Sequence, residues 1–177
     1  MNFTYILTIK KQILKTHHKK IKEMNQIRKV VKTDIEALIE VLNSIELFPA
    51  EMLEDMIADY FNNPKTKDIW FTTLQNNQPI SIAFCAPEKL TEGTYNLYAI
   101  GVKSEIQGKG IGSQMMAYIE KYLKQSGNRI LIVETSGAEE YQLTRKFYEN
   151  LNYTKEATIR EFWSKGEDKV IFWKKLN

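Results

Sequence analysis

Residues 95–113 read YNLYAIGVKSEIQGKGIGS, and this order of residue types indicates a strand, a glycine-rich loop and the start of a helix. Apolar and aromatic residues fill positions 95–102, which predicts the strand. Gly108, Gly110 and Gly112 follow, and apolar side chains then recur at helical spacing. A helix start presents unpaired amides and partial positive charge, and glycines let the backbone approach phosphate oxygens closely. We therefore expect the loop to bind a phosphate group.

Three interpretations of the loop compete. A P-loop requires Lys and Ser/Thr directly after its last glycine, and Ser113 follows Gly112 instead, which excludes that motif. A dinucleotide-binding fingerprint requires a third glycine at position 113, where this sequence has Ser113. Glu134, however, lies at the spacing usual for the carboxylate that binds the ribose in such proteins. That interpretation stays open, although too little chain follows for a doubly wound domain. A glycine-rich turn without a ligand is the third.

Patterning on both sides of the loop predicts a mixed α/β fold. The run 129–135, RILIVET, is apolar throughout and indicates a strand buried on both faces. The other strands are expected at 26–32, 69–74, 80–86, 95–102, 153–163 and 169–175. Helices are expected after Thr33, from Pro49 to Phe61, from the loop to Gly127, and over 139–150.

Length and composition fit one globular domain. The chain has 177 residues, of which 43% are hydrophobic and 27% are charged, enough to bury a core without disulfides or metals. Its single cysteine, Cys85, lies in an apolar run and is interpreted as a core residue rather than a catalytic thiol. A lone cysteine fits a reducing compartment, so we expect a cytoplasmic protein. No apolar run reaches the roughly 18 residues that a membrane span needs.

Excess positive charge is confined to residues 1–23, which we interpret as a basic N-terminal extension. This segment has six lysines and one glutamate, whereas residues 24–177 have 19 basic and 21 acidic residues. The net charge of residues 24–177 is therefore close to zero and gives no indication of nucleic-acid binding. In the extension the apolar segment precedes the basic one, the reverse of a secretory signal. An arm directed to RNA or to a membrane surface stays open, and adjacent His17 and His18 predict no metal site.

Two motifs carry a resemblance to a known family. The segment 107–112, QGKGIG, resembles the Gln/Arg-x-x-Gly-x-Gly/Ala signature of the GNAT superfamily of acetyl-CoA-dependent N-acetyltransferases. The segment 147–153, FYENLNY, is similar to that family's Phe-Tyr-x-x-x-Gly-Phe/Tyr motif. Asn152 replaces the usual glycine, and asparagine also tolerates a left-handed backbone. The resemblance covers residues 24–177 and implies a GNAT-like mixed, splayed seven-stranded sheet flanked by about four helices.

The resemblance implies a site for acetyl-CoA as co-substrate and no metal. Its pantetheine arm would lie along the strand 95–102, with an amide near Ile100 polarising the thioester carbonyl. Gly101 would ease the approach of the cofactor. The implied cofactor-binding residues are Ile100, Gly101, Val102, Gln107, Gly108, Lys109, Gly110, Ile111, Gly112 and Ser113.

The resemblance also implies a proton donor. Tyr148 matches the family tyrosine that protonates the leaving thiolate, and the alternative is a core tyrosine. Glu134 is a candidate general base; Glu92 and Tyr98 are others. The expected function is acetyl transfer to a primary amine, of a small molecule or a peptide, by direct attack in a ternary complex. A non-catalytic acyl-CoA-binding module is the alternative, and a homodimer stays open.

Less specific expectations concern the cofactor's 3′-phosphate and the acceptor. Arg145 and Lys146 would either reach the cofactor's 3′-phosphate or face solvent. The resemblance implies that the acceptor lies between the first two helices and the late hairpin, beside residues that are mostly apolar or acidic. These are Glu46, Leu47, Phe48, Glu51, Met52, Met56, Glu161, Phe162 and Trp163.

Overall fold

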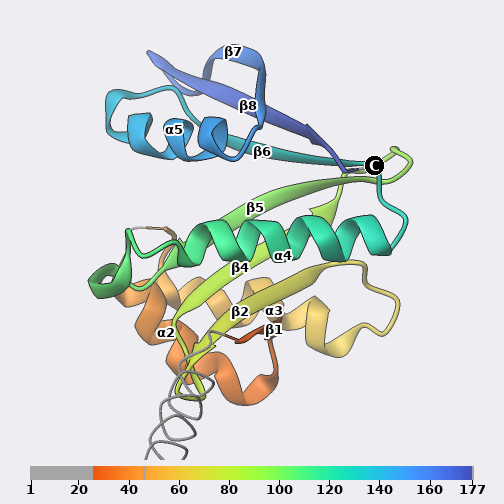
Figure 1. Cartoon of the computed structure of the whole chain (residues 1–177), viewed down its shortest axis with the longest axis vertical. Helices are drawn as coiled ribbons and strands as arrows, with labels where there is room; N and C mark the ends of the chain where they lie inside the picture. The colour runs from red at the N-terminus through yellow and green to blue at the C-terminus, as the bar shows by residue number, and fades with distance from the viewer. Residues whose placement is uncertain (1–25, 46, 177) are drawn as a thin grey trace, which may run out of the picture.

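The computed structural model describes residues 26–45 and 47–176 (Figure 1). The predicted extension over residues 1–23 lies outside these ranges. Within them, no helix is long and apolar enough to cross a membrane. The strands are β1 (Gln26–Lys29), β2 (Ile69–Gln75), β3 (Gln78–Pro79), β4 (Ser81–Pro87), β5 (Thr94–Val102), β6 (Ile130–Ser136), β7 (Thr154–Ser164) and β8 (Glu167–Lys175). The helices are α2 (Ile35–Asn43), α3 (Leu53–Asn62), α4 (Ile111–Gln125) and α5 (Gln142–Asn150).

The strands form one mixed sheet in the order β1-β2-β4-β5-β6-β8-β7, with the short β3 beside β2. The predicted seven-stranded α/β sheet with four helices is confirmed, and β3 is an addition of two residues. Along the described chain, β5 and β6 are the parallel neighbours and the other pairs are antiparallel. The helix α4 connects the two parallel strands, as a crossover requires.

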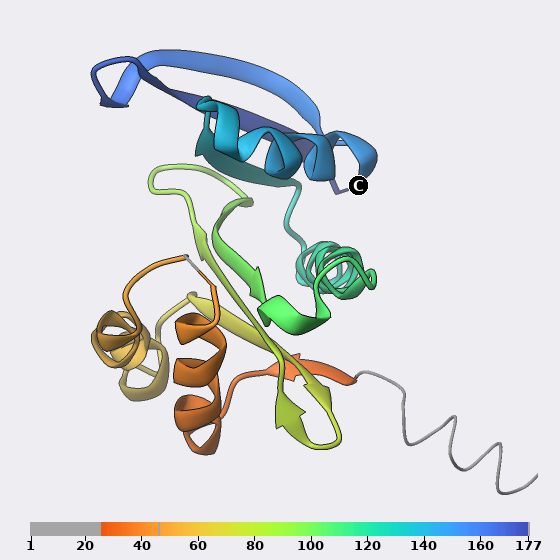
Figure 2. The same ribbon diagram turned by 90° about the vertical axis from the view of Figure 1, so that its left-hand side faces the viewer.

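Two apolar cores cover the two faces of the sheet. Because neighbouring side chains of a strand point to opposite faces, Trp70 and Phe71 of β2 belong to different cores. The Trp70 core takes the buried faces of α2 and α3, and the Phe71 core takes those of α4 and α5 (Figures 1 and 2). Cys85 is fully buried in the Phe71 core, which confirms its interpretation as a core residue.

The parallel pairing of β5 and β6 ends half-way along β5. Thr94–Leu97 pair with Ile130–Val133, and β6 then continues to pair only with β8. On the other side of β5, Leu97 and Ala99 face the adjacent residues Cys85 and Phe84 of β4, so Tyr98 is an extra, bulged residue. A bulge bends its strand and increases the local twist. The second half of β5 therefore diverges from β6, and Figure 2 shows the two parts of the sheet separating.

Candidate functional site

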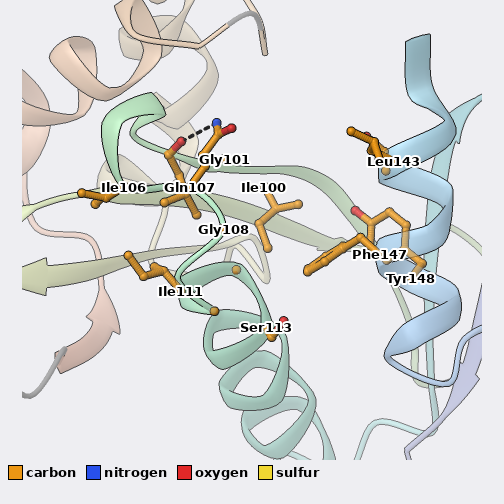
Figure 3. A pocket seen from close by; sticks show the side chains of 14 residues that line it. Ile100, Gly101, Ile106, Gln107, Gly108, Ile111, Ser113, Leu143, Phe147 and Tyr148 are labelled. Carbon is orange, nitrogen blue, oxygen red and sulfur yellow. Dashed lines mark hydrogen bonds between the residues drawn. The ribbon is translucent and has the colours of Figure 1, made fainter.

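The divergence leaves one edge of β5 without a partner strand. The amide of Lys103 donates to the carbonyl of Ile80, the residue before β4, at 2.9 Å. In an antiparallel pair, alternate residues turn their amides to the partner, so the amides of Ile100 and Val102 face away from β4. The carbonyl of Val102 accepts a hydrogen bond from Nε2 of Gln107, at 2.9 Å (Figure 3). This edge can pair with an extended ligand.

The glycine-rich loop presents further unpaired amides. Gly108 and Gly110 have φ of 73° and 79°, in the left-handed region, and a Cβ at either would meet open space. Gly110 is the residue before α4, and the first amide that α4 pairs is that of Gln114, with the carbonyl of Gly110. The amides of residues 111–113 therefore point out of the helix start, where an anion binds favourably.

A first cavity of about 590 Å³ lies between this loop and α5 (Figure 3). The predicted cofactor-binding residues line it, except the exposed Lys109. On its opposite wall, the ring of Phe147 lies 3.5 Å from where a Cβ of Gly112 would be. The lining residues are Ile100, Gly101, Val102, Ile106, Gln107, Gly108, Gly110, Ile111, Gly112, Ser113, Leu143, Thr144, Phe147 and Tyr148.

A second cavity of about 660 Å³ adjoins the first, on the side of β6 and the β7–β8 hairpin. The two cavities share the lining residues Ile100, Gly101, Gln107, Thr144 and Tyr148. The others that line the second are Ile45, Leu47, Leu97, Tyr98, Ala99, Val133, Glu134, Thr135, Ser136, Tyr141, Trp163 and Glu167.

The structure brings only part of the predicted acceptor region to this second cavity. Leu47 and Trp163 line it, whereas Phe48 and Glu51 line a further hollow beside α2, which shares Ile45 and Leu47 with the second cavity. Glu46 lies outside the described residues. The other residues predicted to surround the acceptor do not line the second cavity either: Met52, Met56, Glu161 and Phe162.

Tyr148 is both a core residue and a site residue. Its ring packs 5.5 Å from that of Phe172 and 5.8 Å from that of Tyr153, and only 3% of the residue is exposed. Its phenol end reaches the place where the cavities meet (Figure 3). Burial raises the pKa of Tyr148 well above its ordinary value, so the phenol stays neutral and can donate a proton.

Glu134 faces the second cavity as one member of an ion pair. Its Oε2 lies 3.0 Å from Nζ of Lys169, and the ammonium also lies 3.6 Å from the ring centroid of Phe162. Of the other candidate bases, Tyr98 lines the same cavity and its hydroxyl donates to Glu88, at 3.2 Å. Glu92 does not line the cavity; its backbone carbonyl accepts from Arg129.

Arg145 holds the chain between β6 and α5. Its Nη1 donates to the carbonyls of Ser136 and Ala138, at 2.8 and 2.7 Å, which engages this nitrogen within the protein. Lys146 is exposed. Neither lines either cavity. Across residues 26–45 and 47–176, no group of three His, Cys, Asp or Glu side chains is placed to hold a metal ion.

Sequence reasoning missed Tyr141 and Thr144. They precede Tyr148 by seven and four residues, and helical spacing places such residues on the face of Tyr148. Extending that face backward from Tyr148 would have found both. Ile45 and Glu167 carried no comparable local signal, since the fold alone brings them to the cavity.

Comparisons with known proteins agree on one family. The family model described as the acetyltransferase (GNAT) family matches residues 35–153. An uncharacterised N-acetyltransferase of Methanocaldococcus jannaschii is 28% identical over 86 residues, which are 47% of this chain and 53% of that protein. The match thus spans about half the length of this curated relative.

Two solved structures show a similar fold. A structure from Desulfovibrio desulfuricans, assigned to the GNAT family of acetyltransferases, has a TM-score of 0.81 at 26% identity and covers 87% of this chain and 100% of its own. A Salmonella typhimurium structure, described as an acetyltransferase with its cofactor acetyl-CoA, has a TM-score of 0.70 at 14% identity. It covers 87% of this chain and 95% of its own, and at this identity the likeness shows the fold alone.

Substitution of Gly101 by alanine tests how the wall of the second cavity is packed. The added Cβ would overlap Cδ1 of Ile45 and lie 3.1 Å from Cδ2 of Leu47, so both side chains must move. We expect Gly101→Ala to lower the free energy of unfolding by about 1–3 kcal/mol, as overpacking does. Urea unfolding in an Ile45→Ala background should show a penalty smaller by about 1 kcal/mol or more. Equal penalties in the two backgrounds would contradict this packing.

Proposed function

The chain belongs to the acetyltransferase (GNAT) family, and from this premise we propose that it transfers an acetyl group from acetyl-CoA to a primary amine in a ternary complex. The observation that carries the proposal is the junction of two cavities at Ile100 and Tyr148. One cavity is rich in backbone amides and the other contains carboxylates. Two substrates entering from the two sides would meet at this junction, and such orientation alone can supply several kcal/mol of the barrier.

The residues of the first cavity fit a CoA thioester. The free amides of residues 111–113 would bind the pyrophosphate, and the open space at Gly108 and Gly110 admits it. The outward amides of Ile100 and Val102 would pair with the amide-containing pantetheine arm, as a strand pairs with a sheet edge. The Salmonella typhimurium structure, which shares the fold, is described with its cofactor acetyl-CoA, and this supports acetyl-CoA as the ligand.

The reaction then needs three protein groups. The amine nitrogen attacks the thioester carbonyl carbon, and the amide of Ile100 stabilises charge on the carbonyl oxygen. As the carbon–sulfur bond breaks, Tyr148 donates its proton to the sulfur. Glu134 attracts the protonated amine into the second cavity and accepts its proton through water. Its ion pair with Lys169, at 3.0 Å, orients this carboxylate.

A matched pair of glycine substitutions tests the phosphate site. Gly110 and Gly127 precede and follow α4 with φ of 79° and 82°, and a Cβ at either meets open space. Alanine at either position should lower the free energy of unfolding by about 1–2 kcal/mol, the cost of a left-handed backbone. Calorimetry should show acetyl-CoA binding at least tenfold weaker for Gly110→Ala and unchanged for Gly127→Ala. Equal binding by both variants would remove the phosphate site from the loop.

The proton donor is tested by removing one phenol hydroxyl. We expect Tyr148→Phe to lower kcat by about a hundredfold or more without changing the Kd for acetyl-CoA. The control is Tyr153→Phe, because Tyr153 is also buried in this core but does not line either cavity. Its hydroxyl donates to Glu120 at 2.9 Å, so its loss should lower stability and leave kcat intact.

The pH dependence of kcat gives a second readout of the same group. Because burial raises the pKa of Tyr148, the active protonated form persists as pH rises. We therefore expect no fall in kcat up to about pH 10, the ordinary pKa of tyrosine. A fall below that pH that disappears in Tyr148→Phe would show a phenol with an unshifted or lowered pKa. Unchanged turnover in Tyr148→Phe would refute the proton-donor role.

A further inference from the structure

The second cavity has an acidic lining. Glu134 and Glu167 are the charged residues among those that line it in the described part of the chain, and no lysine, arginine or histidine is among them. They come from different strands, β6 and β8. A cavity with this lining favours a ligand of positive charge.

The two carboxylates differ in how far their charge is already balanced. Glu134 has Lys169 at 3.0 Å, and this ammonium lies against the ring of Phe162, with 9% of the lysine side chain exposed. Glu167 forms no ion pair with the residues that the structure describes, and its Oε2 accepts a hydrogen bond from Ser164, at 3.2 Å. The uncompensated negative charge of the cavity is therefore that of Glu167.

Aromatic rings line the same cavity. Tyr98, Tyr141 and Trp163 are 53%, 41% and 49% exposed as residues, and Nζ of Lys169 lies 5.6 Å from the ring centroid of Trp163. Each comes from a different segment: the bulge of β5, the turn before α5 and the end of β7. A cation over an aromatic face is stabilised by the ring quadrupole, and more strongly when partly desolvated. Carboxylate and rings together form a site suited to an organic cation.

We propose that the acceptor amine carries a second cationic group, which Glu167 and the ring of Trp163 hold. This inference rests on the proposed acetyl transfer and names its substrate class. The reacting amine must lose its proton before attack, so it cannot supply this charge at the moment of reaction. The reacting end occupies the junction at Ile100 and Tyr148, and the distal cation lies toward the β7–β8 hairpin. A linear diamine is the simplest molecule of this class.

The test compares linear diamines of three to eight methylenes with the monoamine of the same length, with acetyl-CoA saturating. For at least one length, we expect a KM at least tenfold lower for the diamine, beyond the factor of two from its two equivalent amines. Glu167→Gln should abolish this preference by raising the KM for the diamine to that for the monoamine. The matched control Glu156→Gln, which removes an exposed carboxylate of β7 outside the cavity, should retain it.

Each outcome separates this inference from the proposed function. Acetylation of monoamines and diamines with equal KM at every length would overturn the inference and leave acetyl transfer standing. If no amine is acetylated, acetyl transfer to these amines fails, and calorimetric titration of the CoA-saturated protein with the diamines decides the cation site. Diamine binding that Glu167→Gln weakens at least tenfold would support the site. Absence of diamine binding, or equal binding by Glu167→Gln, would overturn it.

Discussion

The early end of the parallel pairing between β5 and β6 is the constraint on which the rest of the site depends. Hydrogen bonds hold the two strands together only up to Leu97 and Val133. Beyond that point the bulge at Tyr98 bends β5, while β8 keeps β6 in the other part of the sheet. A continuous ladder would have paired the amides of Ile100 and Val102 with β6 and closed both cavities.

A ligand can form hydrogen bonds with the backbone amides that the sheet leaves unpaired. Edge amides and helix-start amides are strong donors that need partners, and here both kinds border one cavity. The wall opposite them is α5, whose Phe147 packs near Gly112 and whose Tyr148 is fixed by the core rings behind it. A bound ligand would thus lie between backbone amides and packed side chains of α5, which favours precise placement of the reacting atoms.

Local pattern predicted the strand, the loop and the order of elements, because hydrophobic period and turn residues are properties of neighbouring positions. The candidate role of Tyr148 came from the resemblance to the family motif. Asn152 adopts the predicted left-handed backbone, with φ of 61°. Two pairings distant in sequence could not be predicted: Glu134 with Lys169, and Gly101 with Ile45. The bonds of Arg145 to carbonyls seven and nine residues earlier depend on the turn between β6 and α5. At Gly101, a cofactor approach was expected, and the side chain of Ile45 makes the close approach on the Cβ side. The bulge leaves no mark in the strand pattern either, since Tyr98 favours strands like its neighbours.

Amide hydrogen exchange, resolved by residue and measured with and without acetyl-CoA, tests the central claim most directly. The account predicts that acetyl-CoA protects the outward amides of Ile100 and Val102 and those of residues 108–113. It predicts little change at Thr94–Leu97, whose strand segment is already paired on both sides. Protection confined to the β7–β8 hairpin, or saturating binding without protection at β5 and the loop, would contradict the claim that the open edge of β5 is the cofactor site.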